Sequence, residues 1–68
     1  MLLKRIRKEK GFSQSYMAKR LNIGVTTYYQ YENGGRKIPK DTAIAIAKIL
    51  NKKIYDIFLP IKFTLREK

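Results

Sequence analysis

Residues 14–34 of the chain read QSYMAKRLNIGVTTYYQYENG, and their pattern of apolar side chains decides the fold. The first part of this stretch places apolar residues at the three- and four-residue steps of one helix face, at Met17, Ala18 and Leu21. Ser13 is a favourable N-cap before this run, and Asn22 after it adopts a left-handed backbone more easily than most residues. We therefore expect a helix over residues 14–21.

A second short helix is expected over residues 25–32. Tyr28 and Tyr31 lie three residues apart and so face the same side of this helix, toward the core. The polar residues around them are Thr26, Thr27 and Gln30. Residues 22–24 form the turn before the helix, and residues 33–35 break the chain after it. Two short helices joined by a three-residue turn are the elements of a helix-turn-helix.

Three further helices are predicted around this pair. An apolar stripe at helical spacing indicates a first helix over about residues 2–10, which ends at Gly11. After the pair, Pro39 suits the first position of a new helix. The run AIAIAKIL over residues 43–50 is long and Ala-rich enough to favour a buried helix over a strand. Residues 54–58 predict a short fifth helix that ends before the second proline.

Residues 60–68 change to a different period. Apolar side chains alternate with polar ones at Ile61, Phe63 and Leu65, which is typical of a half-buried strand. We expect one all-α, five-helix domain over residues 1–59, followed by a C-terminal tail or short β-strand. An exposed apolar strand edge can pair with a second copy in an antiparallel ribbon, which would make a homodimer. The alternative is a tail folded back on its own domain.

The chain is strongly basic. Sixteen Lys and Arg residues against five Asp and Glu residues give a formal net charge of +11 over 68 residues. Positive charges at this density repel one another unless the functional protein binds a polyanion. Nucleic acid is therefore the first candidate partner. A solvated basic surface that serves solubility is the plainer alternative. Membrane insertion is not expected, because the apolar run 43–50 is far shorter than the roughly 20 residues that a spanning helix needs.

Catalysis is not expected either. The chain has no Cys and no His, so it lacks thiolate ligands, disulfides, and the commonest metal ligand and general base. Its acidic residues follow no repeating helical spacing, since they stand at Glu9, Glu32, Asp41, Asp56 and Glu67. We therefore expect no enzyme, no metal site and no cofactor. The absence of Cys fits the cytoplasm best, and residues 1–5 lead into charged residues rather than into a signal peptide.

Several separate features carry a family resemblance. Gln14, Ala18 and Asn22 set the register of the two central helices, and residues 31–34 read YENG ahead of basic residues and a proline. Over about residues 3–58 these features resemble the phage-repressor-like helix-turn-helix domains, often called the Xre family. The resemblance implies a compact lambda-repressor-like domain that binds a palindromic operator in double-stranded DNA. It further implies a transcription regulator of a bacterium or phage, acting as a repressor.

Two other roles stay open from the sequence. Resembling domains also serve as antitoxins, which bind a protein toxin and repress their own operon, and only the last residues of this chain could wrap such a partner. A basic surface with five tyrosines could instead stack on unpaired RNA bases. Readers of single strands usually place their aromatic residues on a sheet, however, and one predicted strand is too small a platform.

The resemblance also implies roles for individual residues. The positions expected to face base edges are Gly24, Val25, Thr26, Tyr29 and Gln30. Gln can bond adenine through two hydrogen bonds, and the methyl groups of Val and Thr can pack on thymine. For Tyr29 an ordinary exposed aromatic is the alternative. The residues expected at DNA phosphates are Gln14, Asn33, Arg36, Lys37 and Lys40. Arg7 and Glu32 match a pair that forms an internal salt bridge in the family.

Three residues depart from the family pattern. Asn22 replaces the turn glycine, and Gly24 replaces the usual Ser or Thr cap of the second helix of the pair. Both are tolerable at those sites. Tyr28 stands where an aliphatic core residue is common, so its hydroxyl needs a hydrogen-bond partner or a path to solvent.

Overall fold

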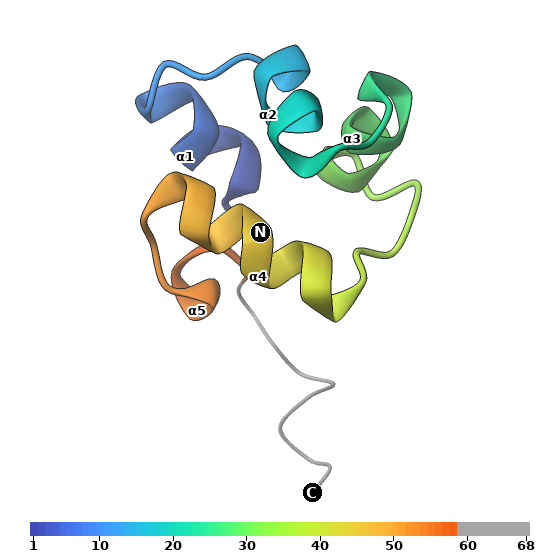
Figure 1. The fold of residues 1–68 in the computed structure, drawn as a ribbon. Helices are drawn as coiled ribbons and strands as arrows, with labels where there is room; N and C mark the ends of the chain where they lie inside the picture. The colour runs from blue at the N-terminus through green and yellow to red at the C-terminus, as the bar shows by residue number, and fades with distance from the viewer. Residues whose placement is uncertain (59–68) are drawn as a thin grey trace, which may run out of the picture.

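The computed structural model describes residues 1–58, and over them the fold is all-α with five helices, as predicted (Figure 1). The helices are α1 (Leu3–Glu9), α2 (Gln14–Leu21), α3 (Val25–Glu32), α4 (Lys40–Leu50) and α5 (Ile54–Ile57). Pro39 does not occupy the first helical position, because its extended ψ of 150° makes it the N-cap of α4. The predicted strand with Ile61, Phe63 and Leu65 lies outside the described residues.

The turn between α2 and α3 follows from local chemistry. Ser13 caps α2, and its hydroxyl oxygen accepts the backbone N–H of Tyr16 at 2.9 Å. Asn22 ends the helix in the left-handed conformation, with φ of 59°. The backbone N–H of Ile23 then donates to the carbonyl of Ala18 at 3.0 Å, which turns the chain toward α3. This short connection holds α2 and α3 side by side.

Side chains from all five helices form one core. Its members are Leu3, Ile6, Met17, Ala18, Tyr28, Tyr31, Ile46, Ala47, Leu50 and Ile57. In Figure 1, α4 crosses beneath α1, α2 and α3, and α5 folds back beside α4 near the start of α1. The backbone N–H of Leu2 donates to the carbonyl of Ile57 at 2.7 Å, which ties the start of the chain to α5. Within residues 1–58, no helix has the length and apolar character needed to cross a membrane.

Tyr28 lies at the centre of this core. Its side chain is fully buried, so the hydroxyl has no path to solvent, and the hydroxyl has no hydrogen-bond partner among residues 1–58. Burial raises the pKa of this hydroxyl, and the nearby Glu32 carboxylate raises it further. The phenol is therefore neutral at pH 7.

We expect the substitution Tyr28→Phe to leave the free energy of unfolding unchanged or to increase it by up to about 1 kcal/mol. The substitution removes a buried polar group that makes no hydrogen bond and keeps the shape of the ring. Urea denaturation measures the difference, with Tyr29→Phe as a control at an exposed site on the same helix. A loss of more than about 1 kcal/mol would contradict the unpartnered state of the hydroxyl.

Candidate nucleic-acid interface

A buried polar network fixes the relative position of α1, α2 and α3. The Nε of Arg7 lies 2.6 Å from Oε2 of Glu32, and its Nη2 donates to Oε1 at 3.3 Å. The third guanidinium nitrogen, Nη1, donates to the carbonyl of Phe12 at 2.7 Å. Gln14 adds a hydrogen bond from its Nε2 to Oε1 of Glu32 at 3.0 Å. The N-terminus of α2 is therefore held against the C-terminal end of α3.

The Glu32 carboxyl group is ionised in the folded protein. Burial by itself would raise its pKa, but the hydrogen bonds from Arg7 and Gln14 and the charge of Arg7 lower it below its usual value. The side chain of Glu32 has no exposed surface and that of Arg7 is 7% exposed, so water screens this pair very little.

The stability of the protein should therefore depend on Glu32 at acid pH. Because the folded pKa is lowered, the ionised carboxylate stabilises the fold above its usual pKa of 4.5, and this contribution is lost as the pH falls through the folded pKa. We expect Glu32→Gln to be less stable than the unmodified chain at pH 7, with a gap that narrows as the pH falls below 4.5. Thermal denaturation across this range measures the gap. Glu9→Gln, the same substitution at an exposed site, is the control.

The outer face of α3 is exposed between its buried tyrosines. Val25 is 46% exposed and Tyr29 is 53% exposed, and Thr26 is exposed as well. Gly24 is the exposed N-cap of α3, where it makes no side-chain hydrogen bond. Gln30 is half-buried. The five positions expected to face bases thus lie on and just before one helix, with polar groups and small apolar side chains at its surface.

The segment after α3 carries three cations, of which Arg36 contacts Gln30 on α3. Arg36, Lys37 and Lys40 are all exposed, and Lys40 is the first residue of α4. Asn33 uses its side chain internally, because its Nδ2 donates to the carbonyl of Tyr29 at 2.8 Å. Its backbone N–H donates to the same carbonyl at 3.1 Å, so its expected contact with a phosphate would come from the second amide hydrogen. Gln14 uses one amide hydrogen in the same way, toward Glu32.

Several backbone donors near these cations are free to bind an anion. Within residues 1–58, the N–H groups of Gly34, Arg36 and Lys37 donate to no protein acceptor. The helices α3 and α4 also begin without a side-chain cap, which leaves their first N–H groups at the positive ends of the helix dipoles. The start of α4 is itself a lysine, Lys40, and an uncapped helix N-terminus beside a cation is a favourable setting for phosphate oxygens.

A comparison with known families finds one match over most of the chain. The family is described as helix-turn-helix, and its model matches residues 3–57. The chain belongs to this family. Within the family it is of the Xre or lambda-repressor-like type, and it is a DNA-binding helix-turn-helix regulator. A comparison with curated proteins finds no match.

This helix-turn-helix protein also carries an aromatic group that the sequence analysis did not single out. The rings of Phe12 and Tyr16 lie 4.5 Å apart between centroids, and the Arg20 guanidinium lies 5.7 Å from the centre of the Tyr16 ring. Arg20 Nη1 also donates to the Tyr16 hydroxyl oxygen at 2.8 Å. Tyr16 and Arg20 stand four residues apart on α2, and Phe12 stands four residues before Tyr16, just ahead of the helix; this spacing is the signal that could have revealed the group.

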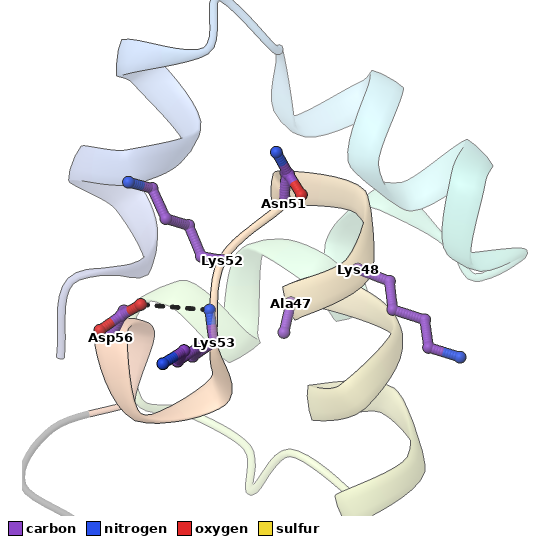
Figure 2. Close-up of a pocket in the computed structure, with 6 residues that line it drawn as sticks. All are labelled: Ala47, Lys48, Asn51, Lys52, Lys53 and Asp56. Carbon is purple, nitrogen blue, oxygen red and sulfur yellow. Dashed lines mark hydrogen bonds between the residues drawn. The ribbon is translucent and has the colours of Figure 1, made fainter.

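Figure 2 shows a hollow between α4 and α5 of the helix-turn-helix protein. The residues that line it are Ala47, Lys48, Asn51, Lys52, Lys53 and Asp56. Its one carboxylate is engaged, because Oδ2 of Asp56 accepts the backbone N–H of Lys53 at 3.2 Å and caps α5. The lysine side chains point in different directions, so they do not converge on a bound group.

Proposed function

We propose that this protein is a sequence-specific transcriptional repressor that acts in the cytoplasm and places α3 in the major groove of duplex DNA. The observation that carries the proposal is the buried Arg7, Glu32 and Gln14 network, which fixes α3 so that its exposed face lies beside a cationic loop. A rigid helix with a free polar face is what base readout requires.

Base contacts and phosphate contacts divide between the two parts of this surface. Base edges are read by Gly24, Val25, Thr26, Tyr29 and Gln30. Phosphates are bound by Gln14, Asn33, Arg36, Lys37 and Lys40. The bond between Gln14 and Glu32 supports this division, because it brings the N-terminus of α2 close to the start of the cationic loop. Contacts to phosphates position the protein, while contacts to bases choose the sequence.

The protein is further proposed to bind as a homodimer. The support is the alternation of Ile61, Phe63 and Leu65, which suits a strand that pairs with its own copy about a twofold axis. A dimer should then prefer a palindrome with half-sites about 34 Å apart, one turn of the double helix. Deleting residues 60–68 and measuring the mass by sedimentation equilibrium tests the ribbon. An unchanged oligomeric state would refute it.

The salt dependence of binding should report the number of cations engaged. Arg36, Lys37 and Lys40 provide three phosphate-binding cations in each protomer. Counterion release then predicts a slope of log affinity against log salt of about −5 for a dimer and about −3 for a monomer. Fluorescence anisotropy over a range of potassium chloride concentrations measures the slope. A slope near zero would contradict the assignment of these cations to phosphates.

Selection of bound sequences from a random pool of duplex DNA tests the proposed function most directly. The expected result is a palindromic consensus with half-sites one helical turn apart. If the selection enriches no sequence, sequence-specific binding is refuted. A consensus together with a second small protein that co-purifies in fixed ratio would favour an antitoxin over a stand-alone repressor.

A further inference from the structure

The side chain of Gln30 is held by the loop that follows α3. Arg36 donates from its Nε to Oε1 of Gln30 at 2.9 Å. The backbone N–H of Gly35 donates to the backbone carbonyl of Gln30, also at 2.9 Å. A Cβ atom added at Gly35 would lie 3.8 Å from the Gln30 Cβ, so Gly35 lies close to the stem of this side chain. Residues 35 and 36 thus hold Gln30 by its backbone carbonyl and by its side-chain amide.

The contact with Arg36 distinguishes between the two orientations of the Gln30 side-chain amide, in which Oε1 and Nε2 exchange places. A guanidinium group donates hydrogen bonds and accepts none. If the amide turned over by 180°, its NH₂ group would face the guanidinium, donor against donor. The hydrogen bond is therefore possible in one of the two amide orientations only. It turns Oε1 toward Arg36 and Nε2 away from it.

We propose that Arg36 is a positioning residue for base recognition, which locks the amide of Gln30 in the orientation that reads one base pair. This inference rests on the proposed function. Adenine presents an acceptor at N7 beside a donor at N6, and a Gln amide matches it only when its donor and acceptor stand in the matching order. The carbonyl oxygen has a second lone pair, so it can accept from a base while it accepts from Arg36.

The fixed orientation of the Gln30 amide has two consequences for DNA binding. It removes part of the cost of immobilising the Gln30 side chain when DNA binds. It also penalises a base pair that would need the reversed amide, because that base must first break the bond to Arg36. Arg36 thereby contributes to sequence choice, although its charge alone would contribute only to affinity. The remaining N–H groups of its guanidinium stay available for a phosphate.

A comparison of Arg36→Ala with Lys37→Ala tests this role, because each variant loses one exposed cation from the same loop. Affinities are measured for the selected operator and for variants that carry every single base-pair change in one half-site. The base pair read by Gln30 is the one whose preference disappears in Gln30→Ala. We expect Arg36→Ala to reduce discrimination at that base pair about three- to tenfold and to leave discrimination elsewhere unchanged. Lys37→Ala should weaken all of these duplexes by the same factor.

Two further measurements complete the test. In the double variant Gln30→Ala with Arg36→Ala, discrimination at that base pair should equal that of Gln30→Ala alone. Without DNA, the side-chain amide of Gln30 should show a higher NMR order parameter in the unmodified chain than in Arg36→Ala. If Arg36→Ala weakens the affinity for all duplexes by one factor, as Lys37→Ala is expected to do, the positioning role is overturned and the proposed function stands. Failure of the unmodified chain to select any sequence would overturn both.

Discussion

Replacing Arg7 by Met should remove a large part of the stability of the protein. The substitution leaves the Glu32 carboxylate fully buried without its ionic partner, and such a loss costs about 3 to 5 kcal/mol. A chain of 68 residues has a total stability of roughly 3 to 10 kcal/mol. The expected loss is therefore between about a third of this stability and all of it. Far-UV circular dichroism, with urea denaturation of the fraction that stays folded, measures it.

The same helix offers a matched control for this prediction. Arg5 pairs with Glu9 at 3.6 Å, but the side chains of this pair are 73% and 60% exposed. An exposed pair at this spacing contributes only about 0.3 to 0.5 kcal/mol, so Arg5→Met should hardly change the unfolding curve. If Arg5→Met and Arg7→Met lower the free energy of unfolding equally, burial does not determine how much the Arg7–Glu32 pair contributes to stability.

A second control separates the unpaired charge from the loss of packing. When Glu32 is also replaced by Met, no buried charge remains, and the double variant should recover part of the stability that Arg7→Met loses. The recovery should be incomplete, because Gln14 and the carbonyl of Phe12 also lose their partners. A double variant less stable than Arg7→Met would contradict this account.

The helices could be predicted from the sequence because their signals are local. The steps between Met17, Ala18 and Leu21, with Ser13 before them and Asn22 after them, predicted the bounds of α2 as the structure has them. The burial of Tyr28 and Tyr31 followed in the same way from their three-residue spacing on one helix. Each of these signals lies within one or two turns of the chain, where periodicity and capping decide the conformation.

The polar contacts at the site could not be predicted in the same way. Gln14 and Glu32 are 18 residues apart, and their hydrogen bond exists only because the turn after α2 folds α3 back against it. The bond between Arg36 and Gln30 likewise depends on the path of the loop after α3, which two glycines leave free to adopt several conformations. Residue types in that loop indicated cations near DNA, but the pairing of one cation with a base-reading residue needed the structure.

The second large effect should separate base contacts from phosphate contacts. Gln30→Ala removes an amide from the face of α3, while Lys37→Ala removes a charge from the exposed loop that follows it. A good bidentate contact with a base contributes about 1 to 3 kcal/mol of discrimination, which is roughly a 5- to 150-fold change in affinity. We expect Gln30→Ala to lose that much affinity for the selected operator and almost none for random duplex DNA.

Lys37→Ala should behave in the opposite way, because a phosphate contact carries no sequence information. It should weaken operator and random DNA by the same factor and make the salt slope shallower by about one for each protomer. Affinities of both variants for both duplexes, measured at several salt concentrations, give the comparison. Equal losses on operator and random DNA for both variants would refute the division, because the exposed face of α3 would then bind DNA without reading it.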